Sequence, residues 1–262
     1  MSRLAGLLAS LLLPLCIAFA PAVASAQSPG QGPPMPIALD LAKVPVGSWA
    51  EYTMTVGQLA KMKMRMALVG KSPAGTILES TVDGELLAPL GGKMVMQVTL
   101  PSGAEKEGTA KKLVMQVGAG DPMDMPLEMT GGKQFTKPNP KTLLKSETIT
   151  VAAGTFKTKH YRDKSAKGEK VDFWISEDVP PLGLVKIEAE QKSNPQIKGP
   201  ITLELAAKGA DAKTTITKPA KPFDQAAFMQ QMTGGRAGGG AGAPAAGKAP
   251  APASAPAAAP KK

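Results

Sequence analysis

Methionine is the residue type whose placement most suggests chemistry in this chain. Many of the 14 methionines occur two positions apart. A thioether sulfur is a soft ligand that suits Cu(I), and the flexible methionine side chain also fills irregular apolar surfaces. The spacing therefore fits a soft-metal site, an apolar core, or an apolar surface that takes a lipid or acyl chain. The closely spaced residues are Met62, Met64 and Met66, then Met94 and Met96, then Met123 and Met125, with Met129 nearby.

A soft-metal site has its best candidate in the polar segment from Asp121 to Met129, which we expect to form a loop or an edge. Alternate residues of one strand lie about 7 Å apart, which is twice the strand rise. One ion cannot be ligated by two neighbours at that spacing unless the backbone bends. We therefore predict no metal site and favour an apolar role for the methionines, with a methionine-based copper binder as an alternative.

Other chemistry has little support in the sequence. The chain holds one histidine, His160, so a metal site with three histidines is excluded. Neither a Gly-x-Ser-x-Gly turn nor a phosphate-binding loop is present. We predict that the protein is not an enzyme, that it has no catalytic residues and no cofactor, and that His160 is an ordinary strand histidine sharing a face with Phe156 and Thr158.

The methionines lie on segments whose side chains alternate in character, which is typical of β-strands. From Lys61 to Met66, charged residues alternate with methionines, so a strand would place all three methionines on one face and the cations on the other. The same alternation occurs over 94–100 and 113–117. Further strands are expected over 50–56, 76–82, 147–151, 155–161, 171–176, 184–190 and 201–207.

About ten short strands separated by turn signals predict a mainly β fold. The expected architecture is a curved antiparallel sheet, closed into a barrel, left as a half-barrel, or doubled into a sandwich, with few helices. One short helix is expected over 223–232. We assign the globular part to a single β domain over residues 37–232.

The first 26 residues have the three parts of a signal peptide. Arg3 precedes an apolar run that ends in the small residues Ala24, Ser25 and Ala26. We predict cleavage after Ala26 and a periplasmic or secreted protein. Cys16 is the one cysteine, so the mature protein has no disulfide and no thiolate ligand.

Two low-complexity segments flank the predicted domain. Residues 27–36 form a Pro/Gly/Gln linker, and residues 233–262 form an Ala/Pro/Gly/Lys tail that we expect to be disordered. The net charge of +10 is spread along the chain rather than clustered among aromatics, so we expect no nucleic-acid partner. The basic tail is a candidate contact for an envelope protein or cell-wall material.

Two neighbouring stretches resemble known envelope proteins. The first runs from Glu147 to Phe156 and continues through His160-Tyr161-Arg162, and the second covers 171–176 and 179–186, with a Pro-x-Gly-Leu-Val-Lys ending. This order resembles uncharacterised bacterial envelope proteins and is loosely similar to the LolA/LolB-type lipoprotein carriers. That resemblance implies a curved antiparallel half-barrel over an apolar cavity, and a lipid or a lipoprotein as partner.

These observations lead to one functional expectation and one main alternative. We expect a non-enzymatic periplasmic or secreted protein that binds an apolar or lipid-like ligand, or an envelope partner, on a curved methionine-rich sheet. The alternative is a structural or assembly protein of the envelope without a small ligand. The expected ligand contacts are Met62, Met64, Met66, Met94, Met96, Met115 and Trp174.

Overall fold

The computed structural model describes residues 35–58, 60–101, 110–130, 135–165, 168–190, 199–226 and 228. The predicted signal peptide, residues 27–34 of the linker and the tail lie outside this part. The predicted helix over 223–232 also lies partly outside it, and residues 225, 226 and 228 are helical.

Each strand that the alternation predicts is present, several with longer bounds. These strands are β2 (Trp49–Val56), β3 (Ala60–Ser72), β4 (Gly75–Gly84), β5 (Lys93–Leu100), β6 (Lys112–Val117), β9 (Leu143–Val151), β10 (Gly154–Lys164), β11 (Lys170–Ile175), β12 (Leu184–Ala189) and β13 (Ile201–Gly209).

Four short strands and three 3-10 helices complete the described elements. The strand β7 (Met123–Met125) lies inside the segment that the sequence suggested as a loop or an edge, and β1 (Met35–Pro36) occupies the end of the predicted linker. These elements are too short to show a period in sequence. The others are β8 (Phe135–Thr136), β14 (Lys221–Pro222), η1 (Glu85–Leu90), η2 (Leu127–Thr130) and η3 (Pro140–Thr142).

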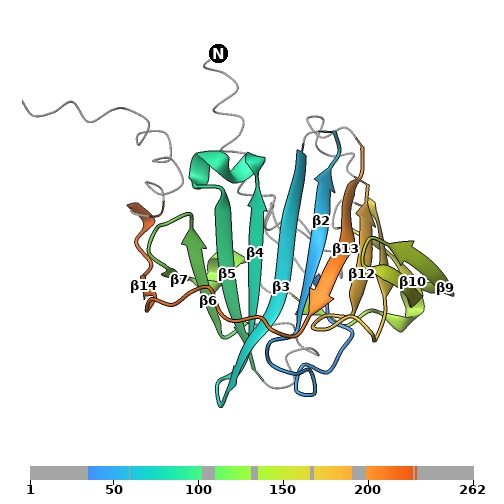
Figure 1. Ribbon diagram of the computed structural model, residues 1–262, viewed down its shortest axis with the longest axis horizontal. Helices are drawn as coiled ribbons and strands as arrows, with labels where there is room; N and C mark the ends of the chain where they lie inside the picture. The colour runs from blue at the N-terminus through green and yellow to red at the C-terminus, as the bar shows by residue number, and fades with distance from the viewer. Residues whose placement is uncertain are drawn as a thin grey trace, which may run out of the picture.

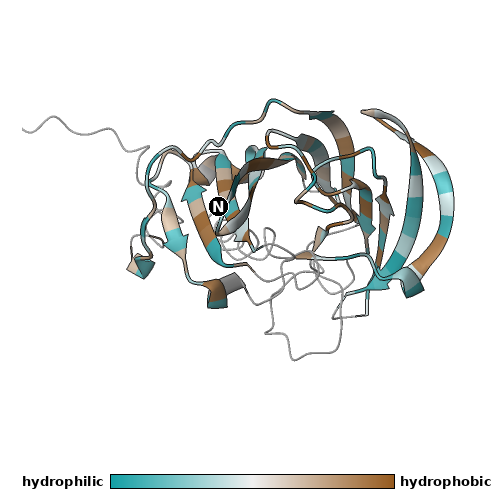
Figure 2. Ribbon diagram, turned by 90° about the horizontal axis from the view of Figure 1, so that it is seen from below, coloured by the Kyte–Doolittle hydropathy of each residue, from teal (hydrophilic) through white to brown (hydrophobic). Residues whose placement is uncertain are grey.

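One twelve-stranded sheet contains most of these strands, in the order β14-β7-β6-β5-β4-β3-β2-β13-β12-β11-β10-β9. Neighbouring strands in this sheet are antiparallel, except that β14 pairs with β7 in parallel. The chain runs from β2 outward to β7 at one side of the sheet. It later enters the sheet again at the opposite edge with β9 and runs inward to β13, which pairs with β2 (Figure 1). The sheet is mixed, strongly curved and not closed, since β14 and β9 form its two edges (Figure 2).

The alternation of side chains gives the sheet an apolar inner face and a polar outer face. On β3, Met62 and Met66 are buried and Met64 is half-buried, whereas Lys61 and Lys63 are exposed on the opposite side, as the sequence predicted. One row of directly opposed inner residues crosses six strands and belongs to a single hydrophobic core. That row is Tyr161, Phe173, Ile187, Leu203, Met54 and Met62.

Residues that precede β2 join this core from outside the twelve-stranded sheet. Ile37 is completely buried and Leu41 is 3% exposed. The backbone N–H of Ile37 donates to Thr136 O, and that of Ala38 donates to Leu182 O, each at 2.8 Å. The pairing of β1 with β8 therefore ties the beginning of the domain to the middle of the chain.

The β9–β10 hairpin folds back over the outer face of the sheet. The N–H of Ala153, at its tip, donates to Leu205 O at 3.3 Å, although β11 and β12 separate β10 from β13. The Lys208 ammonium of β13 also lies 5.3 Å from the centroid of the Phe156 ring. The outer face of β11 and β12 is thereby covered at this end.

Residues 210–222, which we call the C-terminal strap, cross the outer face from the end of β13 to β14 beside β7 (Figure 1). Near its start, the Trp49 indole N–H donates to Asp211 at 2.6 Å. In the middle, Glu79 accepts hydrogen bonds from Thr214 and Thr215. At its end, the Lys221 ammonium lies 2.7 Å from the carboxylate of Asp121. The strap thus runs from the end of β13 to β7, and side-chain contacts hold it to β2, to β4 and to the residue Asp121 before β7.

Candidate functional site

The inner face brings together the six methionines predicted to contact a ligand. Three of them are buried, with Met62 at 3%, Met66 at 2% and Met94 at 8% exposure. The other three are half-buried and pack against the same core. They lie on β3, β5 and β6, and they are Met64, Met96 and Met115.

Cross-strand register, rather than spacing along a strand, decides which methionines are neighbours. Met96 of β5 is directly opposite Met115 of β6, and Met115 is opposite Met123 of β7. We call Met96, Met115 and Met123 the methionine row. On its other side the row continues through Ser80 to Met66. Residues directly opposed on neighbouring strands have Cβ atoms about 5 Å apart, so this row is denser in sulfur than any one strand.

Trp174 does not share a face with the methionines. It lies on β11 opposite His160 and Lys186, and the same register row continues on the outer face through Glu204 and Thr53. The side chain is half-buried beneath the folded hairpin. The expected ligand contacts therefore fall into two places, the methionine face inside and Trp174 outside.

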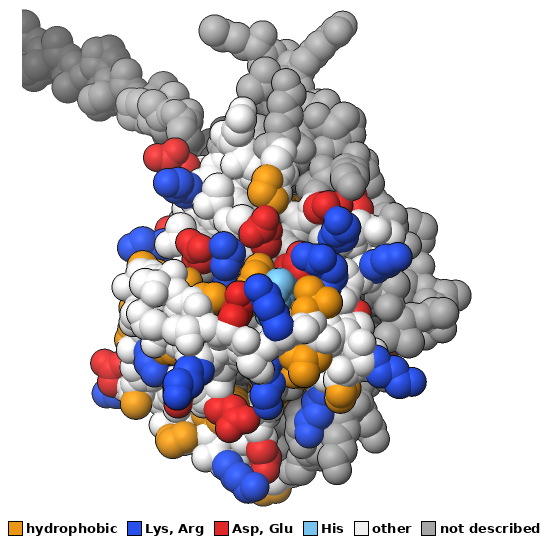
Figure 3. Space-filling model, turned by 90° about the vertical axis from the view of Figure 1, so that its right-hand side faces the viewer, with side chains coloured by type: hydrophobic (Ala, Val, Ile, Leu, Met, Phe, Trp, Pro, Cys, Tyr) orange, Lys and Arg blue, Asp and Glu red, His pale blue; other side chains and the backbone are white. Residues whose placement is uncertain are grey.

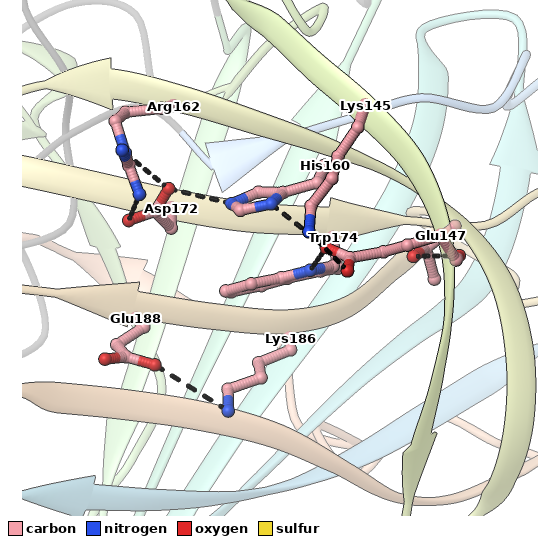
Figure 4. A network of polar contacts seen from close by, with 9 residues as sticks. Lys145, Glu147, His160, Arg162, Asp172, Trp174, Lys186 and Glu188 are labelled. Carbon is pink, nitrogen blue, oxygen red and sulfur yellow. Dashed lines mark hydrogen bonds and ion pairs between the residues drawn. The ribbon is translucent and has the colours of Figure 1, made fainter.

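Trp174 belongs to an outer-face cluster centred on His160 (Figure 4). The Nε2 atom of His160 lies 2.8 Å from Asp172 Oδ1, and its Nδ1 atom lies 3.1 Å from Glu147 Oε1. The Nδ1 contact lacks the alignment of a hydrogen bond. Arg162 holds Asp172 from the other side, with its Nε 2.8 Å from Oδ1. We call these four residues with Trp174 the His160 cluster.

The Trp174 ring completes the His160 cluster in two ways. It stacks on the imidazole with the ring centroids 4.2 Å apart, and its indole N–H donates to Glu147 Oε1 at 2.9 Å. A hydrogen bond from Lys145, and to a smaller extent the one from Trp174, holds the pKa of Glu147 below its ordinary value. On the opposite side of the cluster, the hydrogen bond from Arg162 to Asp172 raises the pKa of the guanidinium.

The His160 cluster links three strands through polar contacts on both sides of a largely buried ring. The two carboxylates contact opposite nitrogens of the ring, so they do not converge on a common point where an ion or a substrate atom could be held. Only 9% of the His160 side chain is exposed. The cluster joins β9, β10 and β11 at the place where the hairpin turns back, and Figure 3 shows its histidine among acidic and basic side chains on this side of the molecule.

Sequence reasoning placed His160 on a strand with Phe156 and Thr158, but it missed the partners of His160. Glu147 and Asp172 stand 13 and 12 positions away along the chain, and strand alternation gives their faces but not their register. These contacts depend on the pairing register of β10 with β9 and of β10 with β11, including the register shift between His160 and Tyr161.

Among the described residues, no group of three or more His, Cys, Asp or Glu side chains is placed to hold a metal ion. Within the same part of the chain, no helix combines the length and the apolar composition needed to cross a bilayer.

Comparisons with known proteins add little to this geometry. No family model and no curated protein matches the sequence. Among solved structures, the chain is similar to a hypothetical protein of Chlamydia trachomatis, with 13% identity and a TM-score of 0.39 over 70% of this chain and 94% of that one.

Two other solved structures are similar at the same low level. A "putative lipoprotein" of Parabacteroides distasonis has 14% identity and a TM-score of 0.32 over 63% of this chain and 95% of that one. A "putative exported protein with YmcC-like fold" of Bacteroides fragilis has 11% identity and a TM-score of 0.30 over 67% and 98%. At such identities and TM-scores, these likenesses carry no argument about function.

Proposed function

We propose that this chain is exported across a bacterial inner membrane and binds an apolar or lipid-like ligand on the inner face of its sheet, without catalysing a reaction. The observation that supports ligand binding is the incomplete burial of Met64, Met96 and Met115. They lie on the face that otherwise forms the core, where their strand neighbours Met62, Met66 and Met94 are buried.

Methionine is suited to an apolar ligand of variable shape. Its unbranched side chain has three rotatable bonds and a polarizable sulfur, so it repacks around different partners at low cost. Apolar surface left in contact with water costs about 25 cal/mol per Å². A ligand that covers the three half-buried side chains would recover that free energy.

Ligand binding is tested by extracting the full chain, purified from the exported fraction, with organic solvent and identifying lipids by mass spectrometry. We expect a stoichiometric apolar ligand with the unaltered protein and with Lys63→Glu, which changes the outer face of β3. Met96→Gln, which keeps the side-chain length but adds a polar end to the inner face, should lose most of it.

An unaltered protein that carries no lipid and binds no fluorescent fatty acid would overturn the proposal of ligand binding, as would a folded Met96→Gln variant that retains the ligand fully. Circular dichroism of each variant establishes folding, and Met115→Gln serves as a second inner-face variant. Export is tested separately by the mass of the secreted protein, which should begin at Gln27.

A further inference from the structure

The methionine row changes the geometry on which soft-metal binding depends. Along one strand, alternate thioethers are about 7 Å apart, and this separation argues against a shared ion. Across strands, Met96 of β5 lies directly opposite Met115 of β6, and Met115 lies directly opposite Met123 of β7. Their Cβ atoms are then about 5 Å from the next in the row, and each side chain has three rotatable bonds with which to bring its sulfur toward a common point.

We propose that the methionine row is a binding site for a soft monovalent cation, Cu(I) or its analogue Ag(I), ligated by three thioether sulfurs. Thioethers select such ions over hard divalent cations, which prefer oxygen ligands. The proposal does not depend on the binding of an apolar ligand: it shares Met96 and Met115 with that ligand surface and adds Met123 of β7.

Burial around the row fits a site that an ion can enter. Met123 is 2% exposed and forms the closed end, whereas Met115 and Met96 are half-buried. A charge transferred into an apolar interior without ligands is strongly unfavourable. Three neutral sulfurs supply coordination, and the partial exposure of two of them reduces the cost of desolvating a monovalent ion.

Among the described residues, a second cross-strand methionine pair shows what the row has in addition. Met54 of β2 is opposite Met62 of β3, but the neighbours of this pair in the same register row are Leu203 and Gly84. Two sulfurs are present there and the third is missing. The row on β5, β6 and β7 brings three sulfurs into succession.

The test uses Ag(I), which has no redox chemistry under these conditions, titrated into the full chain against a chromophoric chelator. Met115→Leu removes the central sulfur and nearly conserves volume. Met125→Leu is the matched control, because Met125 is a buried inner-face methionine of β7 that lies opposite Leu113 and outside the row. We expect one Ag(I) per chain, bound at least about tenfold more weakly by Met115→Leu and unchanged by Met125→Leu.

X-ray absorption of the Cu(I) form gives a readout independent of affinity and should show sulfur neighbours only. Failure of the unaltered chain to compete with the chelator would overturn the site, as would equal weakening by Met115→Leu and Met125→Leu. If Met115→Leu does not fold, Met96→Leu tests the same row. Met96 and Met115 also belong to the proposed ligand surface. The Ag(I) titration is therefore made on chain from which lipid has been extracted and removed, so that the two proposals fail separately.

Discussion

The carboxylate of Glu79 accepts hydrogen bonds from both the backbone N–H and the hydroxyl of Thr215, a residue 136 positions later in the chain. Thr214 and Gln97 donate to the same carboxylate. Glu79 lies on the outer face of β4 and is only 3% exposed. A buried carboxylate of this kind is tolerated because several donors satisfy it, and here it fixes the C-terminal strap at its middle.

Replacing Glu79 should therefore weaken the whole fold. Glu79→Ala leaves the donors of Thr214, Thr215 and Gln97 without their acceptor, and we expect the free energy of unfolding to fall by about 2 kcal/mol or more. Urea denaturation measures the change. Glu85→Ala, at an exposed acidic residue of η1, is the control and should shift stability by less than about 0.5 kcal/mol. Equal effects of the two variants would contradict the anchoring role.

The contact between His160 and Asp172 should contribute measurably to folding. Both side chains are mostly buried, at 9% and 16% exposure, and their closest atoms are 2.8 Å apart. A double-mutant cycle with His160→Gln and Asp172→Asn should give a coupling free energy of about 1 kcal/mol. The same cycle on Lys159 of β10 and Glu177, which follows the end of β11, should give no measurable coupling, because both side chains are exposed and their charged atoms are 4.0 Å apart. Similar coupling free energies in both cycles would show that burial does not strengthen the contact between His160 and Asp172.

Acid should release the strap from Trp49 at a pH below the ordinary range of an aspartate. The hydrogen bond from Trp49 holds the pKa of Asp211 below its ordinary value of 3.8. Because the pKa of Asp211 is lower in the folded state, the stabilisation by this hydrogen bond is complete above the ordinary aspartate pKa. It is lost as the pH falls from that ordinary pKa through the lowered one.

Tryptophan fluorescence can follow this release. The chain has two tryptophans, so Trp174→Phe leaves Trp49 as the single reporter. Its emission should change with a midpoint below pH 3.8, and Asp211→Asn should abolish that transition. A midpoint at or above the ordinary aspartate value would show that the hydrogen bond does not favour the ionised form.

Oxidation should distinguish the methionines of one strand by their exposure. Met64 is half-buried, whereas its neighbours Met62 and Met66 are 3% and 2% exposed on the same inner face of β3. Under dilute peroxide, peptide mass spectrometry should find sulfoxide at Met64, Met96 and Met115 before it appears at Met62 and Met66, because oxidation follows exposure. Oxidation of Met62 and Met66 at the same rate would show that the inner face opens as a whole.

Much of the fold could be predicted from local pattern. The alternation of lysine with methionine over Lys61–Met66 sets which side chains share a face, because successive residues of a strand point to opposite sides of a sheet. Turn residues then limit the length of each strand. The mainly β class, the ten longer strands and the two-faced character of β3 follow from these short-range constraints.

The order and register of the strands depend on contacts between residues far apart in sequence, and no local pattern records them. Residues 210–222 have no strand alternation that predicts a path, yet Glu79 and Asp121 hold them across the sheet. The methionine row and the His160 cluster have the same origin. Side-chain alternation could place each of these residues on a face, but only the pairing of β5 with β6 and β7, and of β10 with β9 and β11, could decide which of them touch.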